Sequence, residues 1–171
     1  LDCYKNLEDL QDAFTHFANA VPFYGKVGVC IDYTNSVAII PHIKRPVVTF
    51  GIHENAEVRG SNIRYNQNQT IFDVIVENRK MGEFCINVPG EHNVKNALGA
   101  VTMALELDIP FGRIQVGLEQ YNGVRRRFDI KYTLDNGIII VDDYAHHPSE
   151  VTSTIQAAKS GWGRRLISIF Q

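Results

Sequence analysis

The spacing of apolar residues changes along the chain, and each change marks a different kind of structure. Near the N-terminus, apolar residues at three- and four-residue steps predict an amphipathic helix from Asn6 to about Ala20, with Asn6 as its N-cap. A buried strand at residues 25–31, a short helix at 36–43 and another strand at 46–52 follow. This alternation of helices and strands predicts an α/β fold.

Segments in which apolar and polar residues alternate come next. They occupy residues 62–67, 70–78 and 82–88, which polar or glycine-containing turns separate. Antiparallel strands with one solvated face have this pattern. The helical period then returns and predicts a long helix from about residue 92 to 107 and a second from about 111 to 121.

A new unit follows the basic turn at residues 122–127. The segments 128–134 and 137–143 flank an Asn-Gly pair, the strongest short signal for a hairpin. A helix is expected from about residue 148 to 159, and a strand at residues 165–170.

The predicted domain boundary therefore lies near Arg127. Residues 1–127 form the first unit, and residues 128–171 open a second α/β unit that is unfinished. A parallel strand needs both faces covered, and the chain stops at or just after its last predicted strand. The first residues also have neither a helix cap nor the composition of a disordered tail. We therefore expect an internal piece of a longer protein.

Composition adds exclusions to this picture. The formal net charge is -2, from 17 basic and 19 acidic residues, so no overall field attracts nucleic acid or an anionic membrane. No apolar run approaches the roughly 20 residues that span a bilayer, and no basic segment leads into an apolar one as in a secretory signal. The isolated cysteines fit reduced thiols better than disulfides or a metal cluster. A cytoplasmic protein without membrane insertion or a nucleic-acid partner is expected.

Asn93 and Asn96 form the first candidate site, where a strand is expected to lead into the long helix. They are three positions apart, so they share one face near the N-terminus of that helix. An amide carries an acceptor and two donors, which match one edge of adenine. The alternative is local: His92 or Asn93 caps the helix and Asn96 points to water.

The run Arg125-Arg126-Arg127 is the second candidate. Adjacent side chains do not share one face, so at most one or two of them can serve one anion. Arginine forms paired hydrogen bonds with phosphate. A solvated hinge whose charges face water is the alternative.

The third candidate is the acidic and imidazole cluster Asp142, Asp143, His146 and His147, which follows a predicted strand. Ligands of open α/β sheets bind beyond the carboxyl ends of strands. These side chains are suited to binding a metal ion or hydroxyl groups. The alternative is a structural turn in which Ser149 or Asp143 caps the next helix.

These segments together have the order and spacing of GxHNxxNAL, GVRRRF and DDYAHHPxE, all within residues 90–150. In this respect the chain resembles the Mur ligase family of peptidoglycan synthesis. The resemblance implies that residues 1–127 are the later part of a central ATP-binding domain with antiparallel strands. It also implies that residues 128–171 begin a Rossmann-like C-terminal domain.

The resemblance also implies roles for single residues. Asn93 and Asn96 would contact the adenine of ATP, Arg127 its phosphates, and Asp143 its ribose. These residues would position ATP and would not transfer protons.

His146 and His147 would face the nucleotide and the acceptor substrate. The family's glycine-rich phosphate loop does not occur in this sequence. The glutamate and histidine that hold magnesium are expected upstream of it. The chain is therefore expected to hold no catalytic or metal-binding residue and to be inactive alone.

The implied reaction is ATP-dependent amide formation through an acyl phosphate. Within the family, the Arg-Arg-Arg-Phe run favours members whose substrates are UDP-N-acetylmuramate and L-alanine, and members that recycle murein tripeptide are the nearest alternative. Two alternatives of other classes are a metal-dependent hydrolase that uses the third candidate cluster and a non-catalytic binding module.

Overall fold

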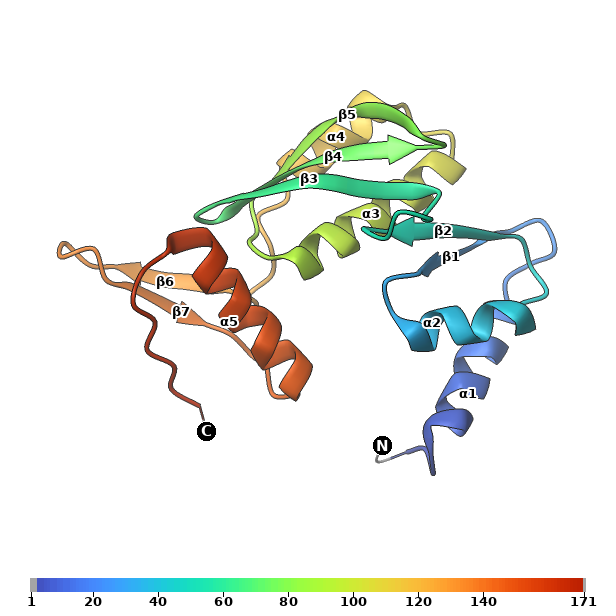
Figure 1. The fold of residues 1–171 in the computed structure, drawn as a ribbon, viewed down its shortest axis with the longest axis horizontal. Coiled ribbons are helices and arrows are strands. Elements are labelled where there is room, and N and C mark those ends of the chain that lie inside the picture. Colours follow the sequence, from blue (N-terminus) through green and yellow to red (C-terminus); the bar gives the residue numbers. More distant parts are fainter. Residues whose placement is uncertain (1–2, 171) are drawn as a thin grey trace.

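The structure is a computed structural model that describes residues 3–170, and its strands form two separate sheets (Figure 1). The elements are α1 (Leu7–Asn19), β1 (Val27–Cys30), α2 (Thr34–Ile39), a 3-10 turn η1 (Ile40–His42), β2 (Val47–Gly51), β3 (Val58–Asn66), β4 (Gln69–Val76), β5 (Arg79–Ile86), α3 (Glu91–Glu106), α4 (Phe111–Glu119), β6 (Asp129–Thr133), β7 (Ile139–Asp142) and α5 (Pro148–Trp162).

The larger sheet has the order β1-β2-β3-β4-β5. The pairs β1–β2 and β2–β3 are parallel, whereas β3–β4 and β4–β5 are antiparallel. The pairing changes to antiparallel in the region where the sequence pattern changes to alternating apolar and polar residues. The predicted α/β fold with antiparallel strands is confirmed.

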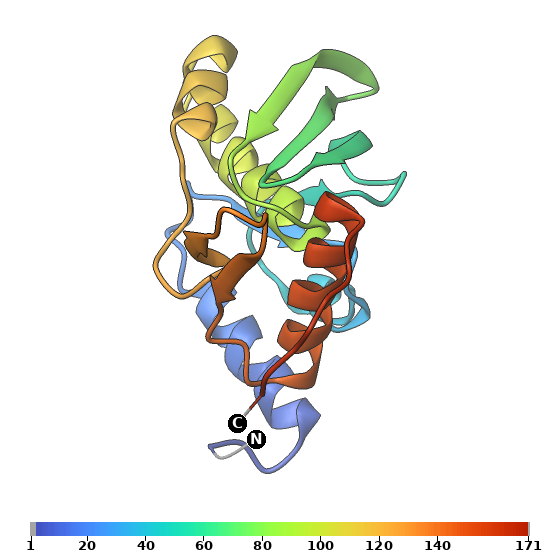
Figure 2. The same cartoon turned by 90° about the vertical axis from the view of Figure 1, so that its left-hand side faces the viewer.

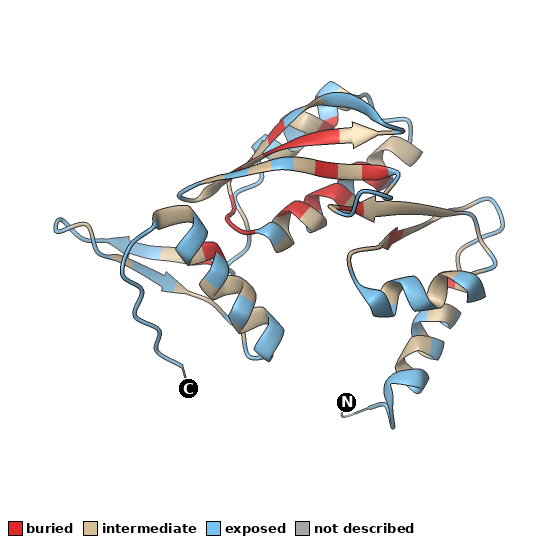
Figure 3. Ribbon diagram, in the orientation of Figure 1, coloured by how far each residue is buried: buried red, intermediate tan, exposed pale blue. Residues whose placement is uncertain are grey.

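The core of this unit lies between the sheet and α3 (Figure 3). Val94, Leu98 and Val101 of α3 are completely buried, and their spacing places them on one face of the helix. They pack against a cluster that includes Phe72 of β4 and Phe84 of β5, whose ring centroids are 5.9 Å apart. Residues on the other faces of α3 remain available for a site.

The second unit consists of the β6–β7 hairpin and α5. Phe128, at the start of this unit, stacks on Trp162 of α5 with ring centroids 5.3 Å apart. The end of α5 also touches the first unit, because the backbone amide of Gln67 donates to the carbonyl of Gly161 at 2.9 Å. Figure 2 shows α5 beside the N-terminal end of α3.

One predicted element is wrong. Residues 165–170 form no strand, although their sequence alternates as a strand would. A strand exists through its hydrogen-bonded neighbours, and among residues 3–170 the smaller sheet contains only β6 and β7. The short helix predicted at 36–43 begins earlier, at Thr34, and its last turn is the 3-10 turn η1. No helix in the described part is long and apolar enough to cross a membrane.

Candidate functional site

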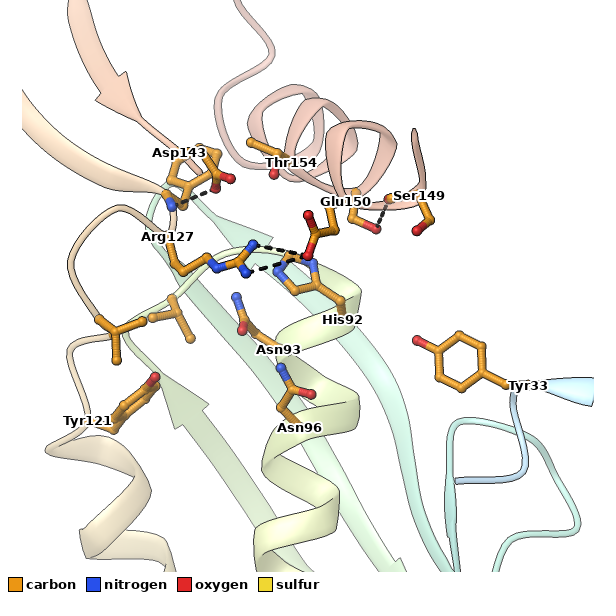
Figure 4. A pocket seen from close by; sticks show the side chains of 15 residues that line it. Tyr33, His92, Asn93, Asn96, Tyr121, Arg127, Asp143, Ser149, Glu150 and Thr154 are labelled. Carbon is orange, nitrogen blue, oxygen red and sulfur yellow. Dashed lines mark hydrogen bonds and ion pairs between the residues drawn. The ribbon is translucent and has the colours of Figure 1, made fainter. Parts of the chain in front are cut away.

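A polar cavity of about 600 Å³ lies between α3, α5 and the segment that joins α4 to β6 (Figure 4). Asn93, Asn96, Arg127 and Asp143 all line it. These four residues come from three separate segments, and the structure brings them together, as one shared nucleotide site would require.

The N-terminus of α3 supplies the two amides. Gly90 is the N-cap, with a φ of 98° that disfavours other residues, and no side chain caps the helix. The Asn93 amide donates to the carbonyl of Pro89 at 2.8 Å, so neither His92 nor Asn93 acts as the cap. Asn96 is exposed, and its amide faces the cavity.

Of the three adjacent arginines, Arg127 alone lines the cavity. Its two terminal nitrogens each donate to the same oxygen of Glu150 at 3.4 Å. Arg126 instead lies over the ring of Tyr144, 4.5 Å from the centroid. The guanidinium that faces the cavity is therefore already paired with a carboxylate.

The side chain of Asp143 connects the end of β7 to the segment before β6 through hydrogen bonds. One of its carboxylate oxygens accepts from the backbone amide of Phe128 at 2.8 Å, and the other from that of Ala145 at 2.7 Å. Phe128 has a φ of 48° and Arg126 one of 59°, values that are uncommon for residues other than glycine. Asp143 thus stabilises a bent backbone beside the cavity, a structural role that the sequence does not reveal.

His146 and His147 do not line the cavity, so their predicted contact with a nucleotide or acceptor stays a prediction. His147 is the N-cap of α5 and accepts a hydrogen bond from the amide of Ser149 at 3.4 Å. The ring of His146 lies 3.0 Å from the carbonyl of Tyr144. The alternative in which Ser149 or Asp143 caps this helix is wrong.

The acidic and imidazole cluster does not converge on a metal site. Among residues 3–170, no group of three or more histidine, cysteine, aspartate or glutamate side chains is placed to hold a metal ion. Asp142 points instead toward Arg126 and Lys131, each 3.9 Å away. The described residues therefore give no structural support to the alternative of a metal-dependent hydrolase.

Several further residues line the cavity, among them Tyr33, His92 and Glu150, to which the sequence pattern assigns no contact with a ligand. Tyr33 follows β1 and reaches the site only through the fold. His92 and Glu150 do stand inside the motifs GxHNxxNAL and DDYAHHPxE, and that position was the available sequence signal. Burial lowers the pKa of His92, and Arg127 lowers it further while Asp143 opposes the shift.

The lowered pKa of His92 predicts a pH dependence of stability. Below the ordinary histidine pKa of about 6.5, the unfolded chain takes up a proton that the folded protein does not. Stability therefore falls as the pH decreases, until the lowered pKa is reached. The variant His92→Gln should lose less unfolding free energy than the parent between about pH 7 and pH 5, as urea titrations at both values would show. An equal loss in both proteins would contradict this role of burial.

A smaller, mostly apolar cavity of about 270 Å³ adjoins the larger one and shares Val88, Asn93, Asn96 and Tyr121 with it. Its other walls are Ile86, Ala97, Ala100 and Leu118. Aliphatic walls, one aromatic ring and amide groups at the opening suit a flat aromatic ligand with a polar edge.

The fold and the cavity define a class: an α/β protein with amide, guanidinium and carboxylate groups around a cavity between α3, α5 and the segment that joins α4 to β6. The model of the Mur ligase middle domain matches residues 1–104, and that of the Mur ligase glutamate ligase domain matches residues 126–171. The chain belongs to the Mur ligase family.

Similar proteins agree with this assignment. The UDP-N-acetylmuramate–L-alanine ligase of Geotalea daltonii is 44% identical over 171 residues, which are 100% of this chain and 37% of that protein. The chain thus spans little more than a third of this relative.

Solved structures share the fold. The UDP-N-acetylmuramate–alanine ligase of Thermotoga maritima has a TM-score of 0.78 at 24% identity, over 94% of this chain and 35% of that chain. The MurF ligase of the same organism, solved with ADP, has a TM-score of 0.75 at 16% identity, over 90% and 35%.

Proposed function

We propose that the cavity binds ATP in an amide-forming ligase. One observation carries this proposal: Asn93, Asn96, Arg127 and Asp143 line a single cavity although they come from separate segments of the chain. A fold shared with a ligase solved with ADP supports it. Residues 1–127 would belong to the central ATP-binding domain, and residues 128–171 to the C-terminal domain.

The two cavities suit different parts of the nucleotide. The base enters the apolar cavity beside Tyr121, and Asn93 and Asn96 contact its polar edge. The Asn93 amide nitrogen already donates to Pro89, so its oxygen remains available as an acceptor. Arg127 contacts the phosphates. Asp143 accepts ribose hydroxyls with the lone pairs that its two backbone hydrogen bonds leave free.

Magnesium does not fit the residues described here. No cluster of ligands exists among residues 3–170, and the carboxylate of Asp143 is held by backbone amides. We therefore propose that magnesium, which the family resemblance implies, is held by residues outside this chain.

The proposed reaction joins UDP-N-acetylmuramate to L-alanine. A carboxylate resists nucleophiles because of its charge. One of its oxygens therefore first takes the terminal phosphoryl group of ATP, which forms an acyl phosphate and releases ADP. The amine of alanine then attacks the acyl carbon, and phosphate and a proton of the amine leave. Catalysis of such transfers rests on positioning and on cations that neutralise developing phosphate charge. Arg127 supplies one such charge, and the other residues orient the nucleotide. Substrates of this kind place the protein in the cytoplasm.

A full-length ligase containing this chain provides the test. ADP release should require both UDP-N-acetylmuramate and L-alanine, and omission of either should reduce it to background. Murein tripeptide in place of L-alanine should not support ADP release. ADP release with murein tripeptide but not with L-alanine would favour the recycling ligase. Absence of ADP release with both second substrates would contradict the proposal. Residues 1–171 alone should give no ligation, because they lack the phosphate loop.

A further inference from the structure

Glu150 uses both of its carboxylate oxygens, and it uses them for different purposes. Oε2 accepts from the backbone amides of His146 at 3.2 Å and His147 at 3.3 Å. It thereby completes the capping box at the start of α5. Oε1 accepts from both terminal nitrogens of Arg127. One side chain thus connects the N-terminus of α5 to the cation that faces the cavity.

The contact with Glu150 uses the two terminal nitrogens of Arg127, which are the atoms with which an arginine binds phosphate. Arginine binds carboxylates and phosphates in the same way, through parallel N–H groups of its planar fork. Here one carboxylate oxygen receives both terminal N–H groups. A carboxylate oxygen of Glu150 therefore occupies the position between the two N–H groups in which arginine can also hold a phosphate oxygen.

The pair is suited to exchange. Both distances are 3.4 Å, longer than the 2.7–2.9 Å that is usual for such charged pairs. The side chains of Arg127 and Glu150 are 47% and 33% exposed, so water screens their attraction. Exposed pairs of this kind contribute about 0–1 kcal/mol, which phosphate groups with several negative charges can offset.

We infer that Glu150 is an internal counter-ion that holds Arg127 in the nucleotide-free protein and that the phosphates of the nucleotide displace. This inference rests on the proposed function. It adds that the arriving nucleotide must break a contact between the connecting segment and α5. The cap of α5 persists, because it depends on the other oxygen of Glu150.

The variant Glu150→Gln tests the effect of the negative charge of Glu150 separately from its role in capping α5. Glutamine keeps an oxygen that can accept from the amides of His146 and His147, and it removes the negative charge beside Arg127. In a full-length ligase, the variant should bind ATP about threefold to fivefold more tightly, measured by calorimetry at fixed salt and magnesium. Adenosine has no phosphate, so its affinity should not change.

Two controls separate this effect from general ones. Glu8→Gln changes the same charge on the exposed face of α1, away from the cavity, and should leave ATP affinity unchanged. In an Arg127→Ala background, Glu150→Gln should change ATP affinity by less than about twofold, because the competed cation is absent. Melting curves show that each variant is folded.

The outcomes distinguish the inference from the proposed function. Tighter ATP binding that depends on Arg127 supports the inference. Weaker or unchanged binding in Glu150→Gln, with Arg127→Ala still weakening ATP binding, overturns the inference alone. No ATP binding by the parent ligase, or no loss in Arg127→Ala, overturns both this inference and the assignment of Arg127 to the phosphates.

Discussion

Replacing Arg127 by lysine in a full-length ligase is expected to lower turnover or ATP affinity by about tenfold or more, equivalent to roughly 1.4 kcal/mol. Arg127 is the arginine of its run that lines the cavity, and its fork is directed at an anion position now held by Glu150. Lysine keeps the charge and loses the second parallel hydrogen bond. Steady-state kinetics with ATP as the varied substrate measures the effect.

The matched control is Arg125→Lys. Arg125 is exposed and does not line the cavity, so its variant should be nearly neutral in kinetics. Both variants should melt close to the parent, because exposed charges contribute about 0–1 kcal/mol. Equal kinetic losses at both positions would mean that the run acts as a diffuse positive patch, and no loss at either would remove Arg127 from the site.

Replacing Gly90 by alanine is expected to lower the free energy of unfolding by about 2 kcal/mol or more and to weaken ATP binding. The φ of Gly90 is 98°, where side chains are strained. A β-carbon there would lie 2.9 Å from the β-carbon of Ala157 in α5 and 2.9 Å from the ring of His92. Relief of these contacts pushes α5 away from α3 and opens the cavity. Urea denaturation and ATP titration measure the two effects.

Gly117→Ala provides the comparison. Gly117 lies within α4, and a β-carbon there meets no atom within 4 Å. Alanine should therefore stabilise the helix, by up to about 1 kcal/mol, and leave ATP binding unchanged. Equal stability of the Gly90→Ala variant and the parent would contradict the close approach of α5 to Gly90.

The sequence by itself predicted most of the helices and strands, and it singled out four of the residues that line the cavity. Helical spacing predicted α3 and its buried face, and it placed Asn93 and Asn96 on a common side near its start. Alternation of apolar and polar residues predicted β3, β4 and β5, and the Asn-Gly pair predicted the β6–β7 hairpin, whose turn has Gly137 at a φ of 82°. These patterns can be recognised in the sequence because the direction of the side chains repeats with a fixed period in a helix and in a strand.

The motif resemblance to the Mur ligase family is confirmed by the family match. The roles that the resemblance gives to Asn93, Asn96, Arg127 and Asp143 remain proposals, as does the domain boundary near Arg127. Their common cavity is what the structure adds.

Only the tertiary structure decided which side chains meet. It paired Arg127 with Glu150, which lies 23 positions away, and placed Tyr33 and His92 at the same cavity. It showed that both oxygens of Asp143 accept hydrogen bonds from backbone amides, and that residues 165–170 do not join either sheet. A periodic pattern shows which face of an element is buried, but not which distant segment covers that face. The pairing of Arg127 with Glu150 depends on how α5 packs beside α3, and no local spacing in the sequence encodes that packing.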